Sequence, residues 1–175
     1  MEVYKVVLLI LLLVFFVYFL FFVYVFSHIQ TFSKRMKRRL RALNIILSEK
    51  AFQLLSMVEN YETLGVSFSD ADQAVLKELR RLKFDKSNYE SVCHNKSFIS
   101  NAEKRLSFIA LGNKALQEDG INMNIKSSLE DLDRNFRRCC VLYNSDLIAY
   151  NYWISIPGTR LFVLLFRLQK AKTIG

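Results

Sequence analysis

The chain has 175 residues, of which 52% are hydrophobic, and it carries 25 Lys and Arg against 16 Asp and Glu. Residues 34–41 hold six of the basic side chains, whereas residues 42–175 hold 18 basic and 15 acidic side chains. This distribution excludes a uniformly basic nucleic-acid-binding domain, and three cysteines, an odd number, exclude a framework of paired disulfides.

The first predicted element is a membrane-spanning helix. Residues 6–26 are 21 residues without a charge. At about 1.5 Å per residue they measure roughly 31 Å as a helix, enough for a hydrocarbon core of about 30 Å. The run is too long for the apolar region of a secretory signal peptide, and no small-residue cleavage site follows it. We therefore expect a single retained span, preceded by a short extracytoplasmic segment, residues 1–5.

A basic juxtamembrane segment, residues 27–41, follows the span. Its basic cluster consists of Lys34, Arg35, Lys37, Arg38, Arg39 and Arg41. Lys and Arg beside a span stay in the cytoplasm, and the N-terminal flank offers only Glu2 and Lys5, so we expect the N-terminus outside and the domain inside. The cluster also predicts attraction to anionic lipid headgroups. No recognisable nucleic-acid-binding fold accompanies it.

Residues 42–175 predict one cytoplasmic helical domain. Apolar residues recur at three- and four-residue steps up to about Glu62, which indicates a helix. The first Gly is Gly65, so nothing obliges the anchor helix to stop at the membrane surface. Ser69 with Asp72 opens a second helix that ends near Phe84, and the polar residues that follow it, up to residue 96, indicate a loop.

Two further helices complete the predicted domain. Residues 97–117 restore the helical spacing, with Ser100 and Glu103 placed as a capping box. The last helix is expected to begin near Ser127, to hold one apolar face, and to end at Pro157. The predicted fold class is therefore all-α, with an N-terminal transmembrane helix followed by an antiparallel bundle of four helices.

The last predicted helix carries a doubled motif. Its residues are Tyr143, Asn144, Tyr150, Asn151 and Pro157. This pattern resembles the C-terminal signature of the LemA-like family of bacterial membrane proteins, and the likeness covers residues 35–165. The chain departs from the family at Ile156, where the family has an aromatic residue, and across residues 63–96. The resemblance implies a membrane-anchored, antiparallel helical bundle, and it implies no particular activity.

The spacing of seven puts both Tyr residues on one stripe of the helix and both Asn residues on the adjacent stripe. Two interpretations stay open. In the first, the rings fill the core while each Asn bonds a facing helix and fixes its register. In the second, the Asn side chains and the phenolic oxygens form a small polar pocket for a ligand.

Other chemistry-bearing residues do not predict catalysis, a metal site or a cofactor. His28 and His94 lie far apart in sequence without a partner at ligand spacing. Cys93 is adjacent to His94, which is not the geometry of a catalytic dyad. Five acidic residues fall in predicted first helical turns, where capping accounts for them: Asp70, Asp72, Glu130, Asp131 and Asp133.

Residues 161–168 (LFVLLFRL) are too short to cross a bilayer and too apolar to lie free in water. They either pack on the end of the bundle or lie on lipid, with the headgroups contacted by Arg160, Arg167, Lys170 and Lys172. An up-down-up-down bundle would return the chain after Pro157 to the membrane side. We therefore expect this segment near the membrane.

The function predicted from these features is that of a single-pass, non-catalytic scaffold or assembly element at the bacterial inner membrane. Two alternatives stay open: a binder of anionic lipid or nucleic acid that uses the basic cluster, and a membrane-tethered enzyme with no recognisable site. The expected partners are the lipid bilayer and either a second copy of the chain or another membrane protein.

Overall fold

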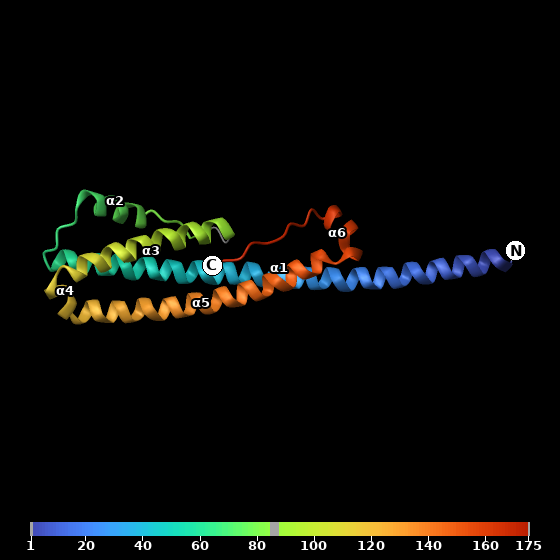
Figure 1. The fold of residues 1–175 in the computed structure, drawn as a ribbon, viewed down its shortest axis with the longest axis horizontal. Helices are drawn as coiled ribbons and strands as arrows, with labels where there is room; N and C mark the ends of the chain where they lie inside the picture. Colours follow the sequence, from blue (N-terminus) through green and yellow to red (C-terminus); the bar gives the residue numbers. More distant parts are fainter. Residues whose placement is uncertain (1, 85–87, 175) are drawn as a thin grey trace. The chain divides into compact units, whose positions relative to one another are not determined.

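The computed structural model is helical across the part of the chain that it describes. This part comprises the backbone of residues 2–84 and 88–174 and the side chains of residues 3–84, 88–159 and 163–174. Within it, the elements in chain order are α1 (Glu2–Thr63), α2 (Asp70–Leu79), α3 (Tyr89–Leu111), α4 (Lys114–Glu118), α5 (Gly120–Ser155), the 3₁₀ helix η1 (Pro157–Thr159) and α6 (Arg160–Leu165) (Figure 1). The predicted all-α class is confirmed.

The chain divides into two compact units. Unit 1 comprises Met1–Met36 with Asn144–Thr173, and unit 2 comprises Lys37–Tyr143 with Ile174–Gly175. The helices α1 and α5 are continuous, and each contributes residues to both units. The expectation that the apolar N-terminal helix runs on into the domain is therefore confirmed.

In unit 2, α1 buries the stripe that its sequence predicted. The buried members are Leu40, Leu43, Leu47, Ala51, Leu54, Val58 and Tyr61. Side-chain bonds give the direction of the facing helix: Lys50 bonds Asp133, and Tyr61, further along α1, bonds the earlier Asn122 of α5. The helices α1 and α5 are thus antiparallel.

The direction of α2 and α3 follows in the same way. Arg105 of α3 pairs with Asp72 at the start of α2, whereas Asn95 bonds the Lys83 carbonyl just after α2, so these helices are antiparallel. Lys96 lies over the ring of Phe136 on α5 at 5.7 Å, and Glu103 shares Lys50 with the earlier Asp133. Unit 2 is therefore an up-down-up-down bundle in which α2 is short, which confirms the predicted antiparallel arrangement.

The helix α3 begins eight residues earlier than predicted. Residues 89–96, expected to form a loop, are its first two turns. The cause is the N-cap Asn88, whose side chain accepts the N–H of Ser91 at 2.8 Å. The predicted capping box at Ser100 and Glu103 is wrong because both residues lie inside α3. Residues 85–87 of the expected loop lie outside the described part.

Three other boundaries also differ from the prediction. The helix α2 ends at Leu79 rather than near Phe84, and the predicted helix over residues 97–117 is interrupted at Gly112, the C-cap of α3. The helix α5 begins seven residues before Ser127, as its bounds show. Its early start has a clear cause, because the Asp119 carboxylate accepts the N–H of Asn122 at 2.8 Å.

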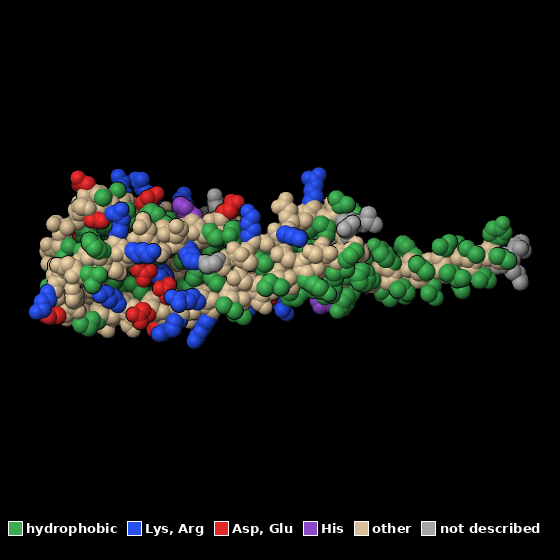
Figure 2. Space-filling view, in the orientation of Figure 1, with side chains coloured by type: hydrophobic (Ala, Val, Ile, Leu, Met, Phe, Trp, Pro, Cys, Tyr) green, Lys and Arg blue, Asp and Glu red, His purple; other side chains and the backbone are tan. Residues whose placement is uncertain are grey.

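Unit 1 contains the apolar half of α1. Residues 3–20 are exposed on every side of the helix, and Figure 2 shows hydrophobic side chains along this stretch. Lys5 is its one charged residue. Beyond them one face becomes buried at Val25 and Ile29. In the described part of the chain, α1 alone is long and apolar enough to cross a membrane. None of the residues in its most apolar 18-residue stretch is buried.

Candidate functional site

The basic cluster lies on the solvent-facing side of α1. Five of its members are exposed and Arg39 is half-buried. At 100° per residue, Lys34, Arg38 and Arg41 point away from the buried stripe that contains Leu40 and Leu43. The sequence has no acidic residue between positions 2 and 49, so the helix itself supplies no countercharge there. This face can attract an anionic surface.

The tyrosines of the doubled motif are core residues. Tyr143 is 3% exposed and Tyr150 is 7% exposed, as their place on the apolar stripe predicted. Burial raises the pKa of both phenols above its ordinary value, because a low-dielectric surrounding disfavours the phenolate. The two rings therefore contribute to the packing of the core.

The second asparagine of the motif holds the C-terminal tail. Asn151 Nδ2 donates to the Ala171 carbonyl at 3.2 Å, and the Ala171 N–H donates to Asn151 Oδ1 at 3.0 Å. The prediction that Asn151 bonds a facing helix is therefore wrong, because its amide pairs with backbone that lies outside any helix. Asn144 is half-buried two turns earlier on α5. Pro157 opens η1 directly after α5, where the missing N–H helps to end the helix.

A buried ion cluster that the sequence interpretation missed joins three helices of unit 2. Lys50 of α1 is 5% exposed. Its Nζ donates to Glu103 Oε2 of α3 at 2.9 Å and to Asp133 Oδ1 of α5 at 2.7 Å. The prediction that Glu130, Asp131 and Asp133 lie in a first helical turn is wrong, because α5 begins at Gly120 and all three lie inside it. The sequence does contain a signal for this cluster. Lys50 follows Leu47 by three residues on the apolar stripe, and a lysine at such a position needs a countercharge.

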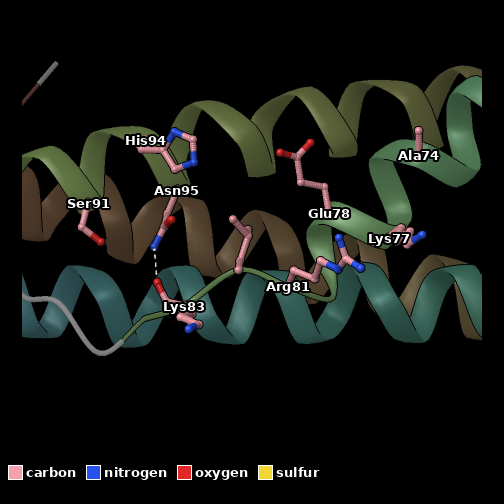
Figure 3. A pocket seen from close by; sticks show the side chains of 9 residues that line it. Ala74, Lys77, Glu78, Arg81, Lys83, Ser91, His94 and Asn95 are labelled. Carbon is pink, nitrogen blue, oxygen red and sulfur yellow. Dashed lines mark hydrogen bonds between the residues drawn. The ribbon is translucent and has the colours of Figure 1, made fainter.

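The groove in Figure 3 lies between α2 and α3 and has a volume of about 580 Å³. His94 and Asn95 come from α3, whereas Lys77 and Glu78 come from α2. The only bond drawn there runs from the buried Asn95 Nδ2 to the Lys83 carbonyl at 3.1 Å. That amide donor is therefore used to fix backbone, and the basic side chains around it are exposed.

The cysteines are free thiols on α3 and α5. Burial is the largest cause of the raised pKa of the Cys139 and Cys140 thiols. Both thiols therefore stay protonated and weakly nucleophilic. Cys139 Sγ donates to the Arg39 carbonyl at 3.6 Å. Cys93 is half-buried and its sequence neighbour His94 is exposed.

The histidines occupy unrelated surroundings. His28, in unit 1, stacks on Trp153 with ring centroids 4.7 Å apart, and His94 lies in unit 2 on α3. Among the residues that the structure describes, no group of three His, Cys, Asp or Glu side chains could hold a metal ion. At the start of α2 the Ser69 side chain accepts the N–H of Asp72 at 3.3 Å, which confirms the predicted helix start, and the Asp72 carboxylate accepts from Ser69 and Arg105.

Comparison with protein families, with curated proteins and with solved structures finds no match. The candidate functional surfaces therefore rest on geometry alone. They are the apolar, fully exposed part of α1, the basic cluster that follows it, and the outward helix faces of the bundle.

Proposed function

We propose that the chain is a single-pass membrane protein whose cytoplasmic helical bundle acts as a non-catalytic scaffold or assembly element at the bacterial inner membrane. One observation carries this proposal. The helix α1 passes without a break from residues 3–20, exposed on every side, into the buried stripe of the bundle. An apolar helix whose side chains are left exposed by its own protein needs lipid around it.

The contacts at the end of the apolar stretch support a retained anchor. Tyr24 meets Trp153 edge to face at 5.8 Å, and the hydroxyl of Tyr18 donates to the Gly158 carbonyl at 3.3 Å. A cleaved signal peptide would take these partners away from the mature chain. Retention keeps the apolar stretch bound to the remainder of unit 1.

The proposed orientation places the N-terminus outside and the bundle in the cytoplasm. The basic cluster supports it, because Lys and Arg beside a span remain on the cytoplasmic side. The free cysteines are consistent with a reducing compartment. Attraction of anionic headgroups by the exposed cluster would then act on the same side as the bundle.

The scaffold role is supported by apolar side chains on outward helix faces. On α5, Ile148 is 66% exposed and Tyr152 is 64% exposed, one turn apart on the same face. On α1, Ile45 and Phe52 form a similar pair seven residues apart. Helix faces of this kind suit a second copy of the chain or another membrane protein as partner.

The proposal also includes the resemblance to the LemA-like family. It is supported by the order of the elements, an apolar anchor helix before a bundle, and by the doubled Tyr-Asn motif on α5. Since the family has no generally established activity, membership would assign the chain a place at the membrane rather than a reaction.

A pair of reporters fused after Gly175 tests the orientation. A fluorescent protein that matures only in the cytoplasm should be active, and a phosphatase that needs periplasmic disulfides should be inactive. The matched control replaces all six basic-cluster residues by Gln and places three Lys after Met1, which should invert both signals. An active phosphatase on the unaltered chain would overturn the orientation.

Alkaline extraction of membranes tests the anchor itself. The unaltered chain should stay in the membrane pellet, and the double variant Leu12→Arg with Phe16→Arg should be released, because charges at the centre of a span oppose insertion. The control Leu12→Ala with Phe16→Ala should remain in the pellet. Release of the unaltered chain would contradict the proposal.

Photo-crosslinking in native membranes tests the scaffold role. A crosslinker placed at Ile148 or Tyr152 should capture a defined protein or a second copy of the chain, whereas the exposed polar position Asn135 on the same helix serves as the control. If the apolar positions yield only the products seen at Asn135, the outward face of α5 is not a working surface.

A further inference from the structure

The C-terminal part of unit 1 runs beside the apolar stretch of α1. Trp153, near the end of α5, lies against Tyr24 and His28, with ring centroids 5.8 and 4.7 Å away. Further along the chain the Gly158 carbonyl accepts from the Tyr18 hydroxyl at 3.3 Å. Phe166 then contacts the Phe26 ring at 5.7 Å. The segment thus moves toward the N-terminal end of α1 and comes back.

The depth of this segment follows from the length of the span, and it rests on the proposed membrane anchor. Tyr18 lies eight residues before Phe26, which is about 12 Å along a helix. If the hydrocarbon instead ended at Tyr18, the uncharged stretch from residue 6 would measure only about 20 Å, too short for a core of about 30 Å. Gly158 therefore lies inside the hydrocarbon.

We propose that residues 154–168, here called the re-entrant hairpin, enter the cytoplasmic leaflet beside the span and bind lipid acyl chains as a second membrane contact. The hairpin does not cross the bilayer. It enters near the level of Trp153, is deepest near Gly158, and returns to the level of Phe26 at Phe166. Trp and Tyr at the entry match the aromatic belt of a membrane interface.

Several polar groups at the tip of the hairpin are bonded, and backbone at membrane depth needs such bonds. Pro157 has no N–H, and the Thr159 N–H donates to the Ile156 carbonyl at 2.9 Å. The Thr159 hydroxyl, on a residue 2% exposed, lies 2.6 Å from that carbonyl and 3.3 Å from the Trp153 carbonyl. These bonds reduce the polarity that Thr159 and the Ile156 carbonyl present to the lipid.

The end of α6 is closed in the same manner. The Leu168 N–H donates to the Val163 carbonyl at 3.0 Å and the Arg167 N–H donates to the Leu164 carbonyl at 3.4 Å. Arg167 has φ +47°, so the turn has the bonds of a Schellman motif. Glycine usually occupies this position, and an arginine there places a charge where the hairpin leaves the lipid.

The outward side of the hairpin is apolar. Leu164 is 75% exposed and Leu165 is 77% exposed. Residues 154–166 carry one charge, Arg160, whose side chain lies outside the described part, whereas Arg167, Lys170 and Lys172 follow directly. An apolar surface bounded by basic residues fits acyl chains with anionic headgroups above them.

Gly158 allows the hairpin to lie close to the span. A Cβ at this position would meet Phe21 Cε1 at 3.4 Å and Phe21 Cζ at 3.9 Å, which is ordinary contact. Alanine should therefore fit, whereas a larger side chain would push the hairpin away from α1. Small residues let helices approach closely in membranes for the same reason.

Quenching of tryptophan fluorescence by brominated lipids tests the hairpin, because Trp153 is the only Trp of the chain. The full-length protein is reconstituted into phosphatidylcholine–phosphatidylglycerol vesicles with bromines near the headgroup or near the chain ends. In a Trp153→Phe background, single tryptophans replace Phe15 in the span, Leu165 in the hairpin, or Phe52 on the outward face of α1 in unit 2. Native Trp153 is measured in parallel without any substitution.

Brominated lipid should quench most of the fluorescence of Phe15→Trp and Leu165→Trp. The fluorescence of Phe52→Trp should be quenched by aqueous iodide and not by brominated lipid. Quenching at Phe15→Trp but not at Leu165→Trp would overturn the hairpin and leave the anchor standing. A tryptophan at 165 protected from both quenchers would also overturn it, by showing that protein covers this surface. No lipid quenching at Phe15→Trp would overturn the membrane anchor itself.

A second pair of variants tests the seat of the hairpin on the span. In the Leu165→Trp chain, Gly158→Ala should leave the lipid quenching unchanged, and Gly158→Leu should reduce it severalfold. Circular dichroism of both chains confirms that the bundle is folded. Equal quenching in the two variants would overturn the role of the close approach at Gly158.

Discussion

Lys50 is the one charged residue buried among the described side chains, and it depends on two carboxylates from different helices. Glu103 and Asp133 keep partial contact with water, with side chains 27% and 38% exposed. The cation itself cannot reach water without moving. Removing the carboxylates therefore harms the folded state more than removing the whole cluster.

The double variant Glu103→Gln with Asp133→Asn should lower the free energy of unfolding by about 3 to 5 kcal/mol, because it leaves Lys50 buried without a countercharge. Adding Lys50→Met should recover most of that loss. Chemical unfolding followed by circular dichroism measures both. The control Glu118→Gln removes an exposed pair with Lys114 and should change nothing measurable; a double variant as stable as this control would contradict the prediction.

Tyr143 and Tyr152 lie on the same helix and differ in burial, 3% against 64% exposed. Tyr143→Ala should cost about 3 to 5 kcal/mol of unfolding free energy, as other large buried aromatics do. Tyr152→Ala should be close to neutral by the same measurement. A stable Tyr143→Ala chain that loses binding of a partner would favour the ligand-pocket interpretation of the motif.

At the scale of elements, sequence spacing predicted the long helices but neither the short α6 nor where two of the long helices begin. The start of α3 was hidden because Asn95, a polar residue, occupies a core position and bonds the Lys83 carbonyl. The start of α5 was hidden by Asn122 in the same way, since it is 1% exposed and bonds Tyr61 and the Leu116 carbonyl. Buried amides interrupt an apolar pattern without interrupting the helix.

Some of the candidate sites could be predicted from the sequence and others could not. The apolar part of α1 and the basic cluster are contiguous in sequence, and their exposure in the structure follows the pattern of the sequence. The Lys50 cluster and the Asn151–Ala171 pairing join residues far apart in the chain, so helical periodicity cannot predict them. The tail that Asn151 binds has no repeating pattern that would place it beside α5.

Capping of α5 by Asp119 gives a test of its true start. Asp119→Ala should cost about 1 kcal/mol of unfolding free energy and speed hydrogen exchange in the first turn of α5. Ser127→Ala is the discriminating control, since that residue would be near the cap if the helix began where the sequence suggested. A larger effect from Ser127→Ala than from Asp119→Ala would contradict the structure.

The stability of α2 should depend on acid. The Ser69 hydroxyl donates to Asp72 at 2.5 Å, and Arg105 lies 3.1 Å away, so both lower the pKa of the carboxyl. Its stabilising contribution is therefore fully present above the unfolded pKa of about 3.9 and is lost as pH falls through the folded pKa below it.

Hydrogen exchange of the α2 amides at a series of acidic pH values measures this loss, after correction for the intrinsic pH dependence of exchange. Asp72→Asn should remove the acid transition of α2, whereas Asp70→Asn, an exposed neighbour in the same turn, should leave it in place. An acid transition that survives in Asp72→Asn would assign the effect to another group.

At the scale of the whole molecule, most of the apolar part of α1 contributes nothing to folding. Residues 3–16 are exposed throughout, so a chain that lacks residues 2–16 should unfold within a few degrees of the full chain in the same detergent. A chain that lacks residues 2–29 also loses Val25 and Ile29, both buried, at about 1.5 to 3 kcal/mol each. Thermal unfolding that falls equally in both truncations would contradict this division of roles.

The apolar stripes of the three long helices of unit 2 repeat every three or four residues. Hydrophobic burial alone therefore hardly distinguishes one alignment of these helices from another. A helix displaced by one turn, about 5.4 Å, would still match apolar side chains with apolar side chains. Lys50 removes this ambiguity, because such a displacement would carry its ammonium out of reach of both carboxylates while the cation stays buried. The buried charge thus fixes the register of the helices, because it stabilises one alignment among several that bury apolar side chains equally well.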